Sequence, residues 1–345
     1  MKASLPSVSI IIPTRNRPRN SEDLLQSILQ QTQPPLEVII VDDSDNDLTK
    51  NLVKQYEGEF TKIGSKFKYI KGPKDGLPAA RNLGVKFAEG DLILFLDDDT
   101  LLEKNVIQTL IFFFEKNPKA LGVQPRILNV GGSSSDSKHV LSLFQYSILK
   151  VFMLTYSAEN KLSVRRSGMS IFPSTLTRVI AAQRLFGCCF CVKREIFTNF
   201  KFDENLKLWA YMEDLDFSYR VYKKNPDSLF AIPYAKVVHK HSPEGRISSK
   251  TTIYMSIIYW FYIFFKDFFE SSILNLLAFM WALLGKLIVT TEVLLLKREP
   301  REKWWDLIWL LAAYLLAFKN LRSILEYNLE FFHKRFLIEG GLNAA

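Results

Sequence analysis

The chain has 345 residues, which suits one large domain with an appendage, or two domains, and it can bury a full core without disulfides. Its composition, 48% hydrophobic and 23% charged, is apolar for a soluble enzyme but too charged for a polytopic membrane protein. The net charge of +9 favours anionic partners such as nucleotides or a membrane surface, and because Lys and Arg form no long basic tract we expect no nucleic acid partner.

The three cysteines, Cys188, Cys189 and Cys191, all lie in one short apolar run. They are too close together to form a disulfide framework, and with no histidine nearby they make a poor metal site. We expect them to be buried, reduced side chains in a cytosolic protein. The short apolar stretch before Pro13 predicts a first strand rather than a signal peptide.

Apolar, β-branched runs alternate with helical patterns over the first 124 residues. Strands are expected at 8–12, 37–41, 67–70, 91–96 and 120–124. Helices are expected at 21–29, where Ser21 is the candidate cap, and at 47–56, 78–88 and 103–116. Apolar strands separated by helices are typical of a parallel sheet covered on both faces. The prediction is therefore an α/β fold with a Rossmann-like, mostly parallel sheet.

Polar clusters follow three of these strands: Pro13-Thr14-Arg15, Asp42-Asp43 and Asp97-Asp98-Asp99. Ligands of open α/β sheets bind outside the carboxyl ends of the strands. We therefore expect the three clusters to converge on one ligand site.

The pattern changes after residue 130. A Gly/Ser-rich linker at 131–135 opens a segment without clean periodicity, which we interpret as an irregular insertion or lid over about 131–183. A strand is then expected at 186–192, a short helix at 193–197, a longer helix at 212–223 and a last strand at 235–238, followed by His239. Residues 1–250 would form the first domain.

Residues 251–345 are richer in apolar and aromatic side chains, with uncharged runs at 251–265, 271–285 and 307–318. A membrane-spanning helix needs about 20 mostly apolar residues, and only 271–296, which contains Lys286 and Glu292, approaches that length. The runs are flanked by Trp304, Trp305 and many basic residues, and Trp260 lies within the first run; these side chains suit an interfacial position. We favour membrane-associated amphipathic helices over spanning helices or a soluble helical appendage.

Three adjacent carboxylates, Asp97 to Asp99, repel one another unless a cation neutralises them. Oxygen ligands at a strand end suit Mg2+ or Mn2+ with positions left for phosphate oxygens; the alternative is a solvated turn. His239 can supply a further ligand, and His241 is the weaker candidate.

Asp42 and Asp43 can accept hydrogen bonds from a base or ribose, or can form an Asx turn. Arg81, near a helix start, can reach phosphate oxygens. Glu213 and Asp214 open a helix, where a carboxylate can act as general base or only cap the helix.

In this order, these segments resemble the family 2 inverting glycosyltransferases of the GT-A fold, in particular the members that transfer one sugar, such as the rhamnosyltransferase-like ones. The resembling segments are VSIIIPTRN at 8–16, VIIVDDS at 38–44, ARN at 80–82, FLDDD at 95–99, and FDE at 202–204 followed by Glu213-Asp214. The resemblance spans roughly residues 7–241.

The resemblance implies a role for each matching position. Asp214 would be the catalytic base, and Asp97, Asp99 and His239 would hold the divalent cation. The nucleotide-sugar site would comprise Pro13, Thr14, Arg15, Asp42, Asp43, Arg81, Asp97, Asp98 and Glu213.

The implied function is inverting, metal-dependent transfer of one sugar from a nucleotide-diphosphate sugar to a hydroxyl of a glycan acceptor. The Gln-x-x-Arg-Trp motif of processive members is missing, since Gln183-Arg184 is followed by Leu185-Phe186. The basic, aromatic C-terminal region favours a lipid-linked acceptor at the cytoplasmic membrane face. The alternatives are a polyprenyl-phosphate sugar synthase, a nucleotidyltransferase that makes nucleotide sugars, and a non-catalytic scaffold.

Overall fold

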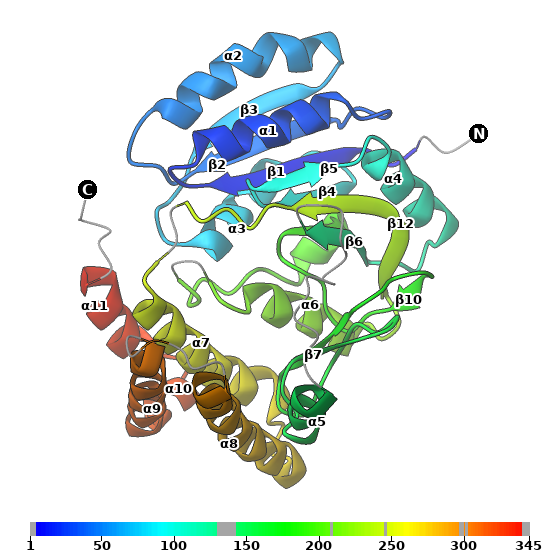
Figure 1. The fold of residues 1–345 in the computed structure, drawn as a ribbon. Coiled ribbons are helices and arrows are strands. Elements are labelled where there is room, and N and C mark those ends of the chain that lie inside the picture. Colours follow the sequence, from blue (N-terminus) through cyan, green and yellow to red (C-terminus); the bar gives the residue numbers. More distant parts are fainter. Residues whose placement is uncertain are drawn as a thin grey trace.

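The computed structural model describes residues 5–129, 143–207, 210–244, 247–296, 300 and 303–339. Its centre is a nine-stranded sheet in the order β10-β12-β6-β11-β4-β1-β2-β3, with β5 paired to β12 (Figure 1). Pairing is parallel among β4, β1, β2 and β3 and between β6 and β12, which confirms the predicted α/β fold with a mostly parallel sheet. The strands are β1 Val8–Thr14, β2 Glu37–Asp42, β3 Lys66–Lys71, β4 Leu92–Leu96, β5 Thr100–Leu102, β6 Gly122–Asn129, β10 Ile180–Ala181, β11 Cys189–Lys193 and β12 Leu229–His239.

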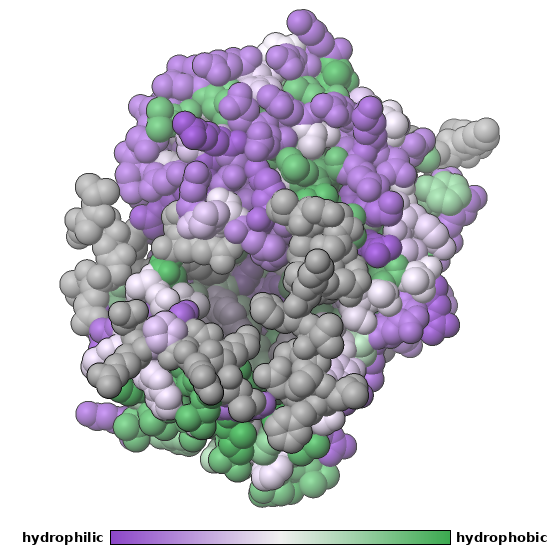
Figure 2. Space-filling model, in the orientation of Figure 1, coloured by the Kyte–Doolittle hydropathy of each residue, from purple (hydrophilic) through white to green (hydrophobic). Residues whose placement is uncertain are grey.

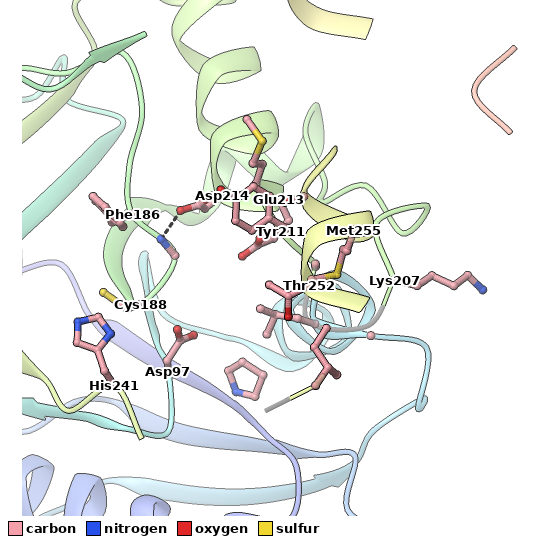
Figure 3. Close-up of a pocket in the computed structure, with 18 of the residues that line it drawn as sticks. Asp97, Phe186, Cys188, Lys207, Tyr211, Glu213, Asp214, His241, Thr252 and Met255 are labelled. Atoms are coloured by element: carbon pink, nitrogen blue, oxygen red, sulfur yellow. Dashed lines mark hydrogen bonds between the residues drawn. The ribbon is translucent and has the colours of Figure 1, made fainter. Parts of the chain in front are cut away.

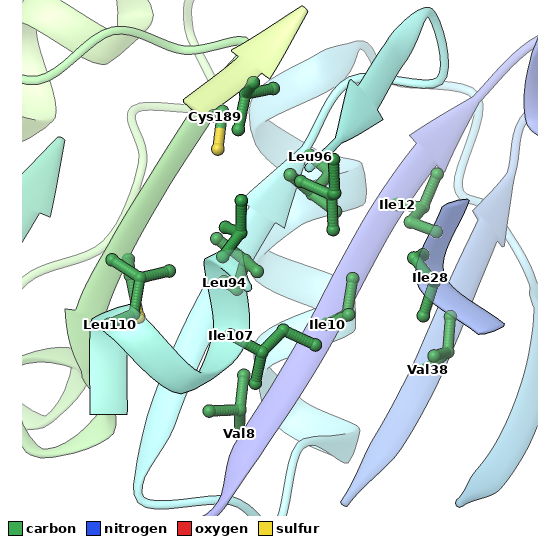
Figure 4. Packing of buried hydrophobic residues seen from close by; sticks show 14 of the residues in the cluster. Val8, Ile10, Ile12, Ile28, Val38, Leu94, Leu96, Ile107, Leu110 and Cys189 are labelled. Atoms are coloured by element: carbon green, nitrogen blue, oxygen red, sulfur yellow. The ribbon is translucent and has the colours of Figure 1, made fainter. Parts of the chain in front are cut away.

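Both faces of the sheet are covered because alternate residues of each buried strand point to opposite sides. In β1, Ile10 and Ile12 join one hydrophobic cluster and Ile11 joins another. The first cluster, shown in Figure 4, includes residues of α1 Pro18–Leu29, α2 Leu48–Lys62 and α4 Val106–Lys116. The second includes residues of α3 Leu77–Phe87, α6 Glu213–Lys224 and the 3-10 helix Arg194–Thr198.

Some expected elements have other bounds. Helix α1 begins at Pro18 rather than at Ser21, because Pro is well placed in a first helical turn; Ser21 is buried inside the helix. Strand β5 was not expected, since only its antiparallel pairing with the end of β12 makes it a strand. The three cysteines are free and buried, as predicted.

The insertion is more regular than its sequence indicates. It holds α5 Leu143–Val151 and a three-stranded sheet in the order β7-β9-β8, formed by β7 Tyr156–Ala158, β8 Ser163–Val164 and β9 Ser170–Pro173. These strands are too short to show a periodic pattern in the sequence. The linker expected at 131–135 lies outside the described residues.

The C-terminal helices are α7 Ser249–Ile263, continued by the π-helical turn Phe264–Phe268, then α8 Ile273–Leu296, α9 Trp304–Lys319, α10 Leu321–Leu325 and α11 Glu330–Glu339. Helix α7 is not the amphipathic surface helix that we expected: its residues 257–263 are all buried, and Trp260, expected at a membrane interface, is only 1% exposed. The reason is that α7 lies among the other C-terminal helices and shares a hydrophobic cluster with Leu206 and Leu215 of the preceding part of the chain. Within the described residues, α8 is the helix long and apolar enough to cross a membrane.

An ionic cluster fastens these helices to α6. Lys266, in the π-helical turn, donates to Asp203 and to Asp216, each at 2.5 Å, and Asp216 also pairs with Arg220. Asp216 is fully buried, so these cations offset the cost of burying its charge. The C-terminal helices are thus held against the helix that carries Glu213 and Asp214.

The buried His333 of α11 predicts a pH-dependent stability. Its Nε2 lies 3.2 Å from the Tyr259 hydroxyl, and burial lowers the pKa of His333 to about 4. Since the unfolded chain binds this proton at about pH 6.5, the free energy of unfolding should fall by up to about 3 kcal/mol as the pH drops from 6.5 to 4. Denaturant titrations of His333→Gln should show a correspondingly shallower loss over this range; curves parallel to those of the unmodified chain would contradict the prediction.

Candidate active site

A cavity of about 830 Å³ opens at the carboxyl ends of the central strands and extends towards α5, α7 and α8. At the sheet end it is lined by Pro13, Thr14, Arg15, Asp43, Asp97, Asp98, Asp99 and His239. Three polar clusters were expected to converge here, and residues of all three line the cavity. Figure 3 shows the neighbouring part, where Asp97, Glu213, Asp214 and Tyr211 face a common space.

Asp99 and His239 meet because β5 and the end of β12 pair antiparallel, with His239 opposite Thr100. His239 Nε2 lies 3.1 Å from Asp99 Oδ1, and the Ser242 amide donates to Asp99 Oδ2 at 2.9 Å. Burial acts to raise the pKa of Asp99, but the His239 and Ser242 contacts outweigh it and lower this pKa to about 2. Asp99 is therefore a carboxylate over the whole physiological pH range.

The acidic cluster fits a divalent cation. Ligand atoms of Asp97, Asp99 and His239 all lie within 4.8 Å of one another, so one ion can contact all three. Two carboxylate oxygens and one imidazole nitrogen suit Mn2+ or Mg2+, and the open cavity beside them leaves room for phosphate oxygens.

Asp98 differs from its two neighbours, although it also lines the cavity. Its Oδ2 accepts a hydrogen bond from the Thr14 hydroxyl at 2.7 Å, and its Oδ1 pairs with Arg17 at 3.2 Å. Burial raises the pKa of Asp98 to about 7, against the effect of Arg17. Asp98 thus ties the ends of β1 and β4 together, and we leave it out of the proposed cation ligands.

Asp42, the last residue of β2, and Asp43, which follows it, point in different directions. Asp42 is fully buried and does not line the cavity: it accepts hydrogen bonds from the Ser44 amide and the Tyr69 hydroxyl, each at 2.9 Å. The structure thus places Asp42 outside the cavity where we expected it, and we leave it out of the proposed nucleotide site. Asp43 lines the cavity and accepts from the Lys74 amide at 2.8 Å; a β-carbon at Gly72 would lie 2.0 Å from its Oδ1, so this approach requires glycine.

Arg81 also takes a different place from the expected phosphate contact. Its guanidinium is fully buried, outside the cavity lining, where it donates to Glu213 Oε1 at 2.7 Å, to Asp97 Oδ1 at 3.0 Å and to the Gly187 carbonyl at 2.9 Å. Burial and the neighbouring Asp214 raise the pKa of Glu213 to about 8, with Arg81 acting in the opposite direction. Arg81 is therefore the residue that positions Asp97 and Glu213.

Removing Arg81 should be costly for stability. In Arg81→Met, the buried Glu213 and Asp97, whose side chain is 30% exposed, lose their cationic partner, and we expect the free energy of unfolding to fall by about 3–5 kcal/mol. Chemical denaturation of the full chain measures this loss. Arg178→Met, which changes an exposed arginine, is the matched control and should stay within about 0.5 kcal/mol of the unmodified chain. A loss below about 1 kcal/mol in Arg81→Met would contradict the prediction.

Asp214 is held by groups from three directions. Its Oδ2 accepts from Arg184 at 2.6 Å and from the Gly187 amide at 2.8 Å, the contact drawn in Figure 3. Its Oδ1 accepts from the Leu215 amide at 2.7 Å. Because a carboxylate oxygen can accept two hydrogen bonds, Oδ1 can take a further donor such as a substrate hydroxyl.

Sequence reasoning missed Arg184 and Tyr211. The Arg184 guanidinium lies beside the paired rings of Phe172 and Phe186, 5.2 and 5.1 Å from their centroids, and donates to Ser170 at 2.8 Å as well as to Asp214. Tyr211 lines the cavity between Ala210 and Met212, which both have positive φ angles, +46° and +69°. Its place two residues before the Glu213-Asp214 motif was the signal for Tyr211. Nothing in the sequence pairs Arg184 with Asp214.

Comparison with known proteins now identifies the family. The sequence pattern described as Glycosyl transferase family 2 matches residues 9–186, more than half of the chain. The chain belongs to glycosyl transferase family 2. The matched segment contains the acidic triplet, Asp43 and Arg81, whereas Asp214 and His239 lie beyond it.

Curated glycosyltransferases resemble parts of this chain. An uncharacterized glycosyltransferase of Rickettsia felis is 36% identical over 110 residues, 32% of this chain and 17% of the relative. Uncharacterized glycosyltransferase EpsJ of Bacillus subtilis is 27% identical over 254 residues, 69% of this chain and 67% of the relative. Poly(ribitol-phosphate) beta-N-acetylglucosaminyltransferase TarP of Staphylococcus aureus is 27% identical over 178 residues, 47% of this chain and 53% of the relative. The chain thus spans less than a fifth of the length of the Rickettsia relative.

Solved structures share the fold. The crystal structure of S. aureus TarS 1-349 aligns with a TM-score of 0.54 at 18% identity and covers 93% of this chain and 90% of that one. The crystal structure of GalNAc-T7 with UDP, GalNAc and Mn2+ aligns with a TM-score of 0.55 at 17% identity, over 76% of this chain and 48% of that one. These likenesses confirm the predicted GT-A type of α/β fold.

Proposed function

We propose that this protein transfers one sugar from a nucleotide-diphosphate sugar to a hydroxyl of a glycan acceptor, with inversion at the anomeric carbon. The observation that carries this proposal is the shared cavity, which has the Asp97-Asp99-His239 cluster at its sheet end and Asp214 on the adjoining wall. A donor whose diphosphate lies at the cluster would present its sugar to the space that Asp214 faces. The family, the relative TarP and the structure of GalNAc-T7 with UDP, GalNAc and Mn2+ support sugar transfer.

The residues at the sheet end would hold the donor. Thr14, Arg15 and Asp43 line the part of the cavity where strands β1 and β2 end, and they offer hydrogen-bonding groups to a base or ribose. A divalent cation, Mg2+ or Mn2+, held by Asp97, Asp99 and His239 would neutralise the charge on the departing nucleoside diphosphate.

Asp214 would act as the general base. In the proposed step, Asp214 Oδ1 takes the proton of the acceptor hydroxyl while the hydroxyl oxygen bonds to the anomeric carbon. The bond from that carbon to the diphosphate oxygen breaks on the opposite face, and its electron pair leaves with the nucleoside diphosphate. Arg184 and the Gly187 amide hold Asp214 Oδ2, which leaves Oδ1 directed to the acceptor.

The C-terminal helices support a site at a membrane. Leu274, Leu277 and Leu284 of α8 and Leu311 and Leu315 of α9 are exposed. In Figure 2, apolar side chains gather at the lower end of the molecule, where Figure 1 places α8. Exposed apolar areas of this kind mark membrane or protein interfaces. We propose that these helices bind the cytoplasmic face of the membrane and that the acceptor is lipid-linked.

A donor panel tests the proposal. The full chain should release a nucleoside diphosphate from one nucleotide sugar, only when Mn2+ or Mg2+ is added, and a hydroxyl acceptor should speed the release. Release of pyrophosphate from a nucleoside triphosphate would indicate a nucleotidyltransferase instead, and transfer to a bare polyprenyl phosphate would indicate a polyprenyl-phosphate sugar synthase. Either result would overturn transfer to a glycan.

A further inference from the structure

The cavity changes character towards the C-terminal helices. Beyond Asp214 its walls are mainly apolar, and we call this part the apolar arm. It is lined by Leu149, Leu154, Met169, Met255, Val289 and Lys286. A sugar and a nucleoside diphosphate have no large apolar surface, so the proposed donor does not explain this arm.

Lys286 is unusual among the cations of the cavity. Five other basic residues line it, and each forms an ion pair with a carboxylate: Arg15 and Lys74 with Asp45, Arg17 with Asp98, Arg184 with Asp214, and Lys207 with Asp75. The Lys286 side chain is exposed to this cavity, and among the described residues no group forms a hydrogen bond or an ion pair with its ammonium. An ammonium group without a carboxylate partner, beside apolar side chains that limit its contact with water, is available to pair with a bound anion.

The packing of α8 directs Lys286 into the cavity. Trp281 Nε1 donates to the Val151 carbonyl at 2.9 Å, and the Trp281 and Phe152 rings stack at 4.7 Å. Gly285 lies so close to α5 that a β-carbon there would be 2.1 Å from Phe152 Cβ. Since these contacts fix the rotation of α8, the next residue, Lys286, faces the cavity.

The opposite side of α8 is apolar and exposed. It carries Ile273, Leu277, Leu284 and Ile288, and at 100° per residue this stripe is centred about half a turn from Lys286. If the stripe contacts lipid, Lys286 points away from the lipid and into the apolar arm, on the Asp214 side of the cavity. Lys286 is the one charged residue between Ile273 and Thr291. It thus lies where the apolar chain and the anionic group of one ligand would be joined.

We propose that the apolar arm binds the first part of a lipid chain and that Lys286 pairs with the phosphate joining this chain to the acceptor sugar. The ligand class is a phosphate or diphosphate diester that joins a sugar to a long apolar alcohol. This inference rests on the proposed function, in which the acceptor sugar lies beside Asp214. It assigns to α8 the recognition of the acceptor's phosphate in addition to contact with the membrane.

Calorimetry on the full chain in phosphatidylcholine nanodiscs, with heats from empty nanodiscs subtracted, tests the site. The probes are octyl phosphate, neutral octyl glucoside and inorganic phosphate. The unmodified chain should bind octyl phosphate at least tenfold more tightly than either other probe. Lys286→Gln should lower the affinity for octyl phosphate at least tenfold and leave that for octyl glucoside unchanged, and Lys286→Arg should restore it. Lys319→Gln, which changes an exposed lysine of α9 outside the cavity, should bind like the unmodified chain.

Equal binding of octyl phosphate by Lys286→Gln and the unmodified chain would overturn the proposal. Inorganic phosphate binding as tightly as octyl phosphate would overturn it too, since the site would then suit a phosphate-bearing polymer without a lipid. The donor panel is a separate measurement: if no nucleotide sugar is used but octyl phosphate still binds through Lys286, the proposed function fails and the lipid-phosphate site stands.

Discussion

Replacing Asp99 by Asn should lower kcat/KM for sugar transfer by at least about a thousandfold, about 4 kcal/mol of transition-state stabilisation. Asp99 lies beside His239 and belongs, with Asp97, to the cluster that would hold the cation. Its pKa of about 2 keeps the Asp99 side chain ionised. Asn retains the size of the side chain and can still accept from the Ser242 amide, so the fold should survive. The removed charge is the one that attracts the cation.

Calorimetric titration with Mn2+ separates this effect from damage to the fold. Asp99→Asn should bind Mn2+ at least tenfold more weakly than the unmodified chain in the presence of donor. Asp45→Asn is the matched control, because Asp45 is a half-exposed carboxylate near the same strand ends that does not line the cavity. Normal Mn2+ affinity in Asp99→Asn would remove Asp99 from the cation site.

Replacing Asp214 by Asn should lower kcat for transfer by about a hundredfold to ten-thousandfold, the range contributed by a general base. The amide oxygen of Asn can still accept from Arg184 or Gly187, but the side chain cannot take a proton from the acceptor. Because Asp214 lies on the wall beside the sheet end, donor affinity should change little. Single-turnover transfer assays and calorimetry with the donor measure the two quantities separately.

Asp227→Asn is the control for this substitution. Asp227 is an exposed residue with a φ of +58°, a conformation that Asn tolerates well, and the variant should transfer sugar at the normal rate. Transfer by Asp214→Asn within threefold of the unmodified chain would exclude Asp214 as the base. A parallel loss of donor binding would instead show that Asp214 holds the donor.

The amino-acid sequence by itself determined the sheet and the place of the acidic cluster. Strands such as 8–12 and 91–96 are continuous apolar runs that end in polar residues, and parallel strands bring such ends to one edge. This local pattern was enough to predict that Thr14, Asp43 and Asp99 line one site. It was also enough to predict His239 as a candidate, although its position beside Asp99 depends on the unforeseen pairing of β5 with β12.

Only the tertiary structure decided what each charged side chain contacts. Asp42 and Asp43 are adjacent, yet one is buried against Tyr69 and the other lines the cavity, because successive strand residues point to opposite sides. Arg81 and Arg184 find their carboxylates on α6, far along the chain. Hydrophobicity alone could not distinguish the buried helix α7 from the exposed apolar stripe of α8. A protein core and a membrane both favour apolar side chains, so only the tertiary packing decides which helix is buried.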